Sequence, residues 1–379
     1  MGILRLIMLV DNNTQAFFAL VRAGLWEQEV QLSFFDKIDF VKVLNLAEEQ
    51  SVVGLVAAGL EHVIGIKVPK EDVLQFVGQA LQLEQRNQAM NFFIGMTLEK
   101  FHEAGIEAVL IKGQGVAQCY AKPEWRSAGD VDLLLNEENY EKGKAFLKGI
   151  SETEPEEYSF NKEYITTFGG WCLELHGSLR CGLSAALNKE VDAIQKEICD
   201  NYHVRYWEAA GKQISLPEEN EDVMVIFTHF IKHFYKGGLG IRQICDWCRL
   251  LWTYRSTIDV VLLEKRLRAM GLLMEWKAFA AYAVDYLGMP SEALPLYDGA
   301  SKWKSKAEKV HTFIIASGNF GHNIDGGYFR KYPFLIRKTI SMWRRVGVLL
   351  RHSRIFPWHS ITFMPHVLFT GLSSAAKGE

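Results

Sequence analysis

Apolar residues recur at helical spacing over the first quarter of this chain. Between residues 14 and 104 we expect helices at 38–46 and 52–63, then a helix from near Glu71 and a long one that continues to Phe101. Gly105 is expected to end this last helix as a glycine cap. The N-terminal region, residues 1–104, is therefore predicted to be helical.

The apolar period shortens after Gly105, where short runs typical of strands are separated by turn residues. A small helix is expected after the Gly113–Gly115 turn, and another at 137–149. Gly169-Gly170 is expected to join a hairpin. The strands expected here are 108–111, 131–135, 164–168, 171–175 and, as further edge strands, 204–207 and 213–216.

Helical spacing returns after Pro217, with helices expected at 223–234, 241–254, 260–270 and 273–287. The three regions predict an α+β fold, in which a small mixed sheet is flanked by mostly helical N- and C-terminal regions. The predicted domain boundaries are 1–104, 105–216 and 217–379.

Composition narrows the class of protein. With 379 residues, 49% hydrophobic and 23% charged, the chain is expected to be globular, with two or three domains. A net charge of −3 makes nucleic acid an unlikely partner. We expect neither a signal peptide at Met1–Val10 nor a membrane span. Six scattered cysteines indicate free thiols and a cytoplasmic location.

Asp130 and Asp132 stand at the head of an apolar run, and residues two apart on a strand share a face. Two such carboxylates repel each other unless a cation offsets them, and a divalent metal with phosphate ligands is a natural offset. Glu174 lies in a second apolar run, Trp171–His176, and supplies the third carboxylate that a two-metal phosphoryl-transfer site requires. The plainer alternative makes Asp130 a turn residue and Asp132 part of an exposed edge strand.

The turn Lys112-Gly113-Gln114-Gly115 joins a predicted strand to a predicted helix, where glycines let backbone amides approach phosphate oxygens. Lys112 is a candidate phosphate contact, and so is Arg126. The alternatives are a solvated Lys112 and a surface ion pair between Arg126 and Glu124. His176 is either a metal ligand or, as we slightly prefer, a hydrogen-bonded core histidine.

The segments Ile111–Gly115, Arg126–Leu135 and Leu173–His176 together resemble the signature of the uncharacterised bacterial nucleotidyltransferases, within the DNA-polymerase-beta-like nucleotidyltransferase superfamily. The resemblance implies that Asp130, Asp132 and Glu174 bind two Mg²⁺ or Mn²⁺ ions, and that Glu174 orients or deprotonates the attacking hydroxyl. It also implies that Gly113, Gln114 and Gly115 hold the triphosphate. The chain departs from the superfamily at Gly113-Gln114, which replaces Gly-Ser or Gly-Gly, and at Glu174, which replaces aspartate.

The region after residue 217 holds a further polar group. His229 and His233 are four residues apart on one helical face, and Arg242 and Asp246 follow. These residues are expected either to contact the nucleotide or acceptor, or to form an interdomain network in which Asp246 pairs with Arg242 or Arg249. Cys245 and Cys248 match Cys-x-x-Cys but fit a helical pattern, which favours packing over a redox or zinc site.

The chain after Gly326 is basic and aromatic. It admits a helical layer with solvated arginines, which we favour, a membrane-surface segment, or a polyanion-binding segment.

The predicted activity is transfer of a nucleoside monophosphate, AMP by preference, from an NTP to a hydroxyl or phosphate of a small-molecule or protein acceptor. The alternative is a non-catalytic nucleotide-binding or scaffold protein that retains the fold.

Overall fold

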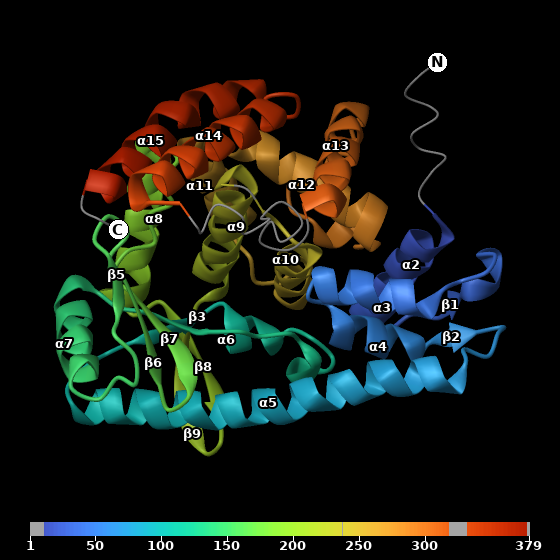
Figure 1. Ribbon diagram of the computed structural model, residues 1–379, viewed down its shortest axis with the longest axis horizontal. Coiled ribbons are helices and arrows are strands. Elements are labelled where there is room, and N and C mark those ends of the chain that lie inside the picture. The colour runs from blue at the N-terminus through green and yellow to red at the C-terminus, as the bar shows by residue number, and fades with distance from the viewer. Residues whose placement is uncertain (1–10, 237, 318–331, 377–379) are drawn as a thin grey trace.

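The computed structural model describes residues 11–236, 238–317 and 332–376 (Figure 1). The apolar N-terminal run Met1–Val10 and the basic residues Arg330 and Lys331 lie outside the described residues. Within these residues the structure combines many helices with a small mixed sheet, which confirms the predicted α+β class.

The N-terminal region is helical except for one short pair of strands. Its elements are α2 (Asn12–Trp26), β1 (Val30–Gln31), η1 (Leu32–Phe34), α3 (Phe40–Glu49), α4 (Val53–Leu60), β2 (Val63–Ile64) and α5 (Lys70–Glu103). The parallel pair β1–β2 was not predicted, because strands of two residues leave no periodicity to read. Gly105 has a φ of 67° directly after α5, as the predicted glycine cap requires.

The helix α5 is one continuous element of 34 residues, which runs along the bottom of the molecule in Figure 1, beneath both the N-terminal helices and the sheet. Its last turns provide Met90, Ile94 and Phe101 to the core of the sheet. The helix therefore serves as a common base for two regions that are distant in sequence.

The central sheet has five strands in the order β3-β4-β7-β6-β5. Only β4 and β7 run parallel; the other neighbouring pairs are antiparallel. The elements of this region are β3 (Val109–Ile111), α6 (Gly113–Ala117), η2 (Pro123–Trp125), β4 (Val131–Leu134), α7 (Glu137–Lys148), β5 (Glu156–Tyr158), β6 (Glu163–Phe168), β7 (Trp171–His176) and α8 (Ala185–Cys199). Because β4 lies between β3 and β7, the alternative that placed Asp132 on an edge strand is wrong.

The two strands predicted as further edge strands, β8 (Val204–Ala209) and β9 (Lys212–Pro217), instead form a separate antiparallel hairpin. The apolar side chains Ile214 and Leu216 of β9 are buried in the core beside β3 and α5. The hairpin thus contacts the sheet region through side-chain packing and, among the described residues, not through backbone hydrogen bonds. The periodicity of a strand is the same in both cases, so the sequence could not tell them apart.

The C-terminal region is helical. It consists of α9 (Glu219–Lys236), α10 (Ile241–Thr253), α11 (Val260–Met270), α12 (Leu273–Leu287), η3 (Ser291–Ala293), α13 (Ser301–Ser317), α14 (Phe334–His352) and α15 (Pro357–Ala376). Its core is continuous with that of α2–α4: the Trp26 indole on α2 donates to the Leu287 carbonyl on α12 at 2.6 Å. Cys245 and Cys248 are free and buried in this helical core.

Among the described residues, no helix is both long enough and apolar enough to cross a lipid bilayer.

Candidate active site

The parallel pairing of β4 with β7 brings two predicted acids together. Asp132 stands directly opposite Glu174, and Leu133 opposite Leu175. Because side chains alternate between the faces of a sheet, the leucines enter the core while both carboxylates point to the other face. The same face lines a cavity of about 300 Å³ under α9 and α10.

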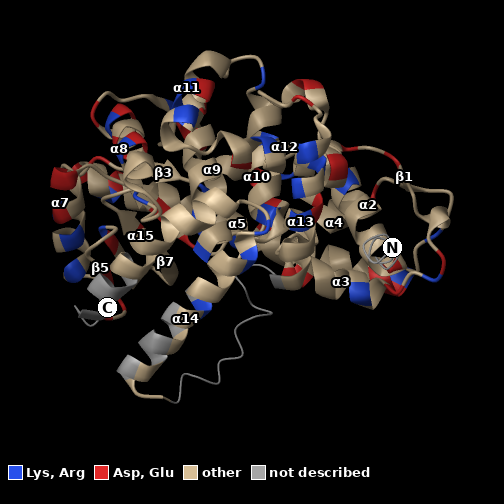
Figure 2. Cartoon of the chain, turned by 90° about the horizontal axis from the view of Figure 1, so that it is seen from above, with Lys and Arg blue, Asp and Glu red and all other residues tan. Residues whose placement is uncertain are grey.

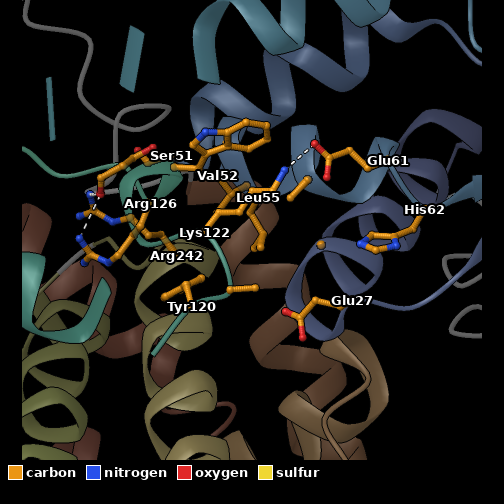
Figure 3. A pocket seen from close by; sticks show the side chains of 16 residues that line it. Glu27, Ser51, Val52, Leu55, Glu61, His62, Tyr120, Lys122, Arg126 and Arg242 are labelled. Carbon is orange, nitrogen blue, oxygen red and sulfur yellow. Dashed lines mark hydrogen bonds and ion pairs between the residues drawn. The ribbon is translucent and has the colours of Figure 1, made fainter. Parts of the chain in front are cut away.

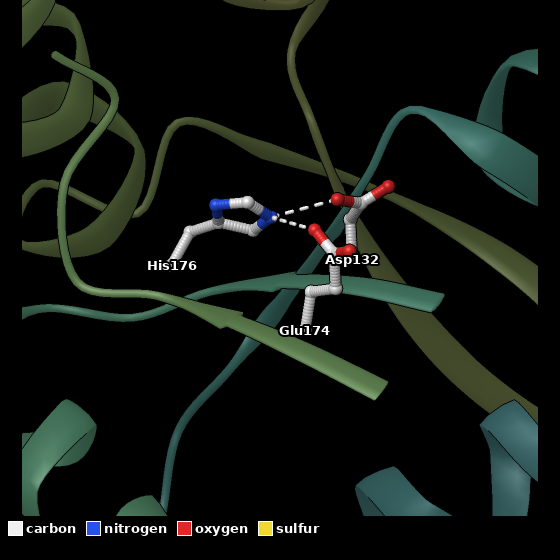
Figure 4. Close-up of side chains that lie close together, drawn as sticks. All are labelled: Asp132, Glu174 and His176. Carbon is white, nitrogen blue, oxygen red and sulfur yellow. Dashed lines mark hydrogen bonds and ion pairs between the residues drawn. The ribbon is translucent and has the colours of Figure 1, made fainter. Parts of the chain in front are cut away.

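Asp132 is almost fully buried and has two polar partners. The Lys112 ammonium donates to its Oδ1 at 2.7 Å, and the His176 Nε2 lies 2.7 Å from the same oxygen. The His176 imidazole also lies 3.6 Å from the Glu174 Oε2, so that it points at both carboxylates (Figure 4). His176 is therefore a buried histidine with polar partners and, at the same time, a member of the acidic cluster.

The cluster has a donor set that fits a divalent cation. One ligand atom from each of Asp132, Glu174 and His176 lies within 4.8 Å of the others. Carboxylates are the ligands that Mg²⁺ and Mn²⁺ prefer, and an imidazole nitrogen adds affinity for Mn²⁺ over Mg²⁺. The Lys112 ammonium already places one positive charge against this cluster, as expected where carboxylates crowd together.

Asp130 is placed differently from the other two acids. It precedes β4, is exposed at the cavity lining, and is not one of the three cluster ligands. Its carboxyl nevertheless senses the neighbouring charge, because Asp132 raises the pKa of Asp130. The predicted set Asp130, Asp132 and Glu174 thus lines one cavity together with His176.

The electrostatics of the cluster favour a bound cation. Burial, together with Asp132 and Asp130, raises the pKa of Glu174 to about 8. Burial also opposes ionisation of Asp132, but Lys112 and His176 outweigh it and hold the pKa of that carboxyl well below its usual range. Neighbouring carboxyls with such divergent pKa values are a common property of catalytic sites.

Lys112 adopts an unusual backbone conformation, with φ 59° and ψ −146°. This region is populated almost only by glycine and costs on the order of 1–3 kcal/mol for other residues. Burial lowers the pKa of the lysine, but the carboxylate of Asp132 outweighs this effect and raises it, so the ammonium stays charged. The surrounding structure thus holds a strained residue with its charge directed at the cluster.

The three residues of the glycine turn have different surroundings. Gly113, with φ 40°, lines the cavity. The side chain of Gln114 is buried away from it and donates to the Asn87 Oδ1 at 2.8 Å, and Gly115 packs against Leu216. The side chain of Gln114 therefore faces α5 and Gly115 faces β9, while the predicted role of Gly113, Gln114 and Gly115 in holding a triphosphate stays a prediction.

Arg126 and Asp246 form a buried bidentate ion pair, with both N–H···O distances at 2.7 Å. The Tyr120 hydroxyl also donates to Asp246, at 2.8 Å. Arg126 therefore pairs with Asp246 and not with Glu124, which corrects that alternative. The partners are 120 residues apart, so sequence proximity suggested the wrong ones.

Arg242 donates to the Ser127 carbonyl at 2.9 Å and, with Arg126, lines the main cavity and a smaller second cavity (Figure 3). This second cavity, of about 50 Å³, lies between α4 and the loop before Arg126. The two guanidinium groups therefore form a shared wall between the cavities.

His229 and His233 face the acids from α9. Their Nε2 atoms lie 3.1 Å apart, and both residues line the main cavity. Burial lowers the pKa of His233 to about 3 and that of His229 well below its usual value. Both imidazoles are therefore neutral near pH 7, and they add polar but uncharged groups to the lining of the cavity.

Two charged residues of the cavity were not predicted. Glu163, at the start of β6, stands opposite His176 in the ladder, and Lys232 of α9 donates to its Oε1 at 2.9 Å. Burial opposes the ionisation of Glu163, but Lys232 outweighs it and lowers the pKa to about 2. The sequence contained a hint of Glu163, because side-chain alternation places it on the same strand face as Ile165. No sequence pattern indicated its partner Lys232 on α9.

Comparison with known proteins supports the assignment of the family. A family model described as uncharacterised nucleotidyltransferase matches residues 36–288. No protein with a curated description matches the chain. An antigenic nucleotidyltransferase-like protein from Paracoccidioides brasiliensis is structurally similar, with 11% sequence identity and a TM-score of 0.32, over 52% of this chain and 92% of that protein. Because the family model spans well over half of its length, the chain belongs to the uncharacterised nucleotidyltransferase family.

Proposed function

We propose that this protein is a metal-dependent nucleotidyltransferase of the DNA-polymerase-beta-like superfamily, which moves a nucleoside monophosphate, AMP by preference, from an NTP to an acceptor hydroxyl or phosphate. The observation that carries the proposal is the pairing of Asp132 with Glu174 on adjacent parallel strands, facing a cavity large enough for a ligand. Family membership supports nucleotidyl transfer in general.

Asp132, Glu174 and His176 would hold one divalent ion, and Asp130 at the cavity lining would complete a site for a second. When bound, such ions neutralise the phosphate charge that develops during in-line displacement. The ions proposed are Mg²⁺ and Mn²⁺, because the carboxylates are hard oxygen ligands.

The residues of the chain account for the remaining parts of the reaction. The acceptor oxygen attacks the α-phosphorus of the NTP, the bond between the α-phosphorus and the bridging oxygen breaks, and pyrophosphate leaves. Glu174 would orient the acceptor hydroxyl or receive its proton. Lys112, whose ammonium already lies in the cavity, would contact the triphosphate as a point charge.

The acceptor would enter from the helical side of the cavity. His229, His233 and Arg242 line that side and offer neutral and cationic donors to a polar molecule. A cavity of about 300 Å³ suits small-molecule groups or one side chain of a protein.

Nucleotide-dependent thermal stabilisation, followed by label transfer, tests this proposal. Each NTP is added with Mn²⁺ or Mg²⁺ to the wild type, to Asp132→Asn and to the control Glu208→Gln, which alters an exposed carboxylate on β8. We expect ATP to raise the Tm of the wild type and the control but not of Asp132→Asn.

The second step uses α-labelled ATP and a cell extract as the source of acceptor. Label on a protein or small molecule, with release of pyrophosphate, is expected from the wild type alone. An NTP-dependent shift that persists in Asp132→Asn, without label transfer by any variant, would instead identify a non-catalytic nucleotide-binding protein.

A further inference from the structure

Two helices at the C-terminal end of the chain expose apolar stripes. On α14, Ile336, Trp343 and Leu350 follow one another at intervals of seven residues, or about two turns, and therefore lie on one face. On α15, Trp358, Ile361 and Phe369 form a second stripe at helical spacing. All six residues are between 47% and 68% exposed.

Other side chains attach this helix pair to the protein. His352 of α14 stacks on Phe234 of α9, and Phe363 of α15 packs edge-on against Tyr235. His359 also hydrogen-bonds to the buried Glu275 of α12. These contacts attach the pair through side chains other than the six of the exposed stripes.

The charge of this segment is one-sided. The sequence has no acidic residue between Asp325 and Glu379, although the whole chain has 45 acidic and 42 basic residues. The described part of α14 shows basic and no acidic colour in Figure 2. Six basic residues fall within α14, α15 and their connection: Arg337, Lys338, Arg344, Arg345, Arg351 and Arg354.

A groove of about 680 Å³ lies between α13 and the C-terminal end of α14. Phe313 and Ile355 provide apolar lining, and the cations are Lys309, Arg351 and Arg354. None of the residues that line the groove within the described chain is acidic. An apolar floor with a cationic rim suits a molecule that carries a phosphate next to an apolar part.

We propose that α14 and α15 dock on the surface of an anionic lipid bilayer. The apolar stripes enter the boundary between headgroups and acyl chains, and Trp343 and Trp358 lie at headgroup depth. Arg351 and Arg354 meet lipid phosphates, one of which enters the groove beside α13. Basic helices with exposed Trp, Phe and Leu bind in the interface plane without crossing it.

The same observations disfavour other occupants. A second copy of this surface would bring two basic segments together, and like charges repel each other. A nucleic acid would satisfy the arginines but leave Ile336, Leu350 and Ile361 against a polar backbone, because nucleic-acid interfaces are polar. An anionic bilayer matches both the charge and the apolar stripes.

Vesicle co-sedimentation of the full chain tests the proposal, with phosphatidylcholine alone or mixed with phosphatidylglycerol. We expect binding to the mixed vesicles, at least tenfold weaker binding to phosphatidylcholine alone, and a blue shift of tryptophan emission on binding. Binding should weaken at high salt because part of the attraction is electrostatic.

Two variants and a control separate the contributions. Trp343→Ser with Trp358→Ser should abolish the blue shift and weaken binding at least tenfold, and Arg351→Glu with Arg354→Glu should remove the preference for phosphatidylglycerol. The control Phe34→Ser changes an exposed aromatic residue of the N-terminal region and should bind as the wild type does. Circular dichroism confirms that each variant is folded.

Three results would overturn the proposal: no sedimentation with either vesicle, unchanged binding by both double variants, or a stable dimer in light scattering that the tryptophan substitutions dissociate. Tight binding of a single-stranded RNA oligomer in place of vesicles would likewise overturn it. These readouts require no nucleotidyl transfer, so they stand apart from the proposed enzymatic function.

Discussion

The two walls of the main cavity are built in different ways. The sheet wall presents Asp132 and Glu174 from adjacent strands, with His176 beside them, while the helical wall presents His229, His233 and Arg242 from α9 and α10. The sheet wall is acidic and its geometry follows from one strand pairing. The helical wall is neutral to cationic, and its place depends on packing between regions far apart in the sequence.

This difference separates two kinds of task. A strand ladder fixes the spacing of opposite side chains, which suits a site that must hold a metal and a reacting phosphate. Helices packed through a large core can present a more varied surface, which suits recognition of an acceptor. The predictions below test whether chemistry belongs to the sheet wall and recognition to the helical wall.

The largest effect is expected from Asp132→Asn, which keeps the shape of the side chain but removes its charge. Loss of a metal-binding carboxylate should lower kcat by about a thousandfold or more while the fold remains. Steady-state assays of pyrophosphate release measure this effect, with Glu208→Gln as the unaffected control. If Asp132→Asn kept activity within tenfold of the wild type, the residues of the sheet wall would not carry out the reaction.

Asp246→Asn tests the ion pair behind the helical wall. The substitution leaves the Arg126 guanidinium buried without its counter-charge, so we expect a loss of about 3–5 kcal/mol in the free energy of unfolding. Urea denaturation measures it. The matched control is Asp192→Asn, which breaks the exposed bidentate pair with Arg180 and should cost less than about 1 kcal/mol. Equal losses of unfolding free energy in both variants would contradict the argument that the buried ion pair contributes more than the exposed one.

His176→Gln tests whether the imidazole helps to hold the ion. It lies beside both carboxylates, so its loss should weaken Mn²⁺ binding by about 10- to 100-fold. Isothermal titration calorimetry measures the affinity, and His102→Gln, at an exposed histidine on α5, is the control. Unchanged affinity would restrict His176 to a hydrogen-bonding role within the core.

Metal binding should depend on pH through Glu174. Its pKa of about 8 means that the metal-free protein holds a proton there below pH 8, and a metal must displace it. The Mn²⁺ affinity should therefore fall by about tenfold for each pH unit below 8, and level off above it. Titrations at several pH values measure this slope, which Glu174→Gln should flatten. A slope already absent in the wild type would contradict the proton linkage.

The smallest effect is expected at the helical wall itself. Single substitutions His229→Asn and His233→Asn should raise the KM of the acceptor by about three- to tenfold with little change in kcat, as for uniform binding contacts. Because their ring nitrogens contact each other, the double variant should be little worse than either single one. A large loss of kcat in either variant would instead show that the histidines of the helical wall take part in the reaction.

Much of the fold was predictable from periodicity, because long helices and alternating strands bury continuous apolar faces. The hairpin of β6 and β7 and the helices α9 to α12 were predicted at nearly their observed bounds. The pair β1–β2 was missed because it is too short, and β8–β9 was misplaced because an apolar strand face does not specify its partner. The domain boundaries remain predictions, although α2–α4 share one core with the C-terminal helices.

In the candidate site, too, local features were predictable from the sequence and long-range partners were not. Acids inside apolar strands were sufficient to select Asp132 and Glu174 as candidates, since burying an unpaired carboxylate is costly. The structure places them opposite each other on adjacent strands. Arg126 was recognised as a polar candidate, but its partner Asp246 lies 120 residues away and no local pattern identified it. The role of Lys112 was suggested by its charge, while its strained backbone was visible only in three dimensions.

By itself, the sequence determined which residues are chemically unusual and which face of each strand or helix they occupy, because these properties depend on the residue type and a local period. Only the tertiary structure decided which unusual residues meet. The parallel pairing of β4 and β7 placed Asp132 opposite Glu174, and the packing of α9 and α10 over the sheet placed a histidine pair and a guanidinium across from them. Such pairings depend on burial summed over the whole core, which no single segment encodes.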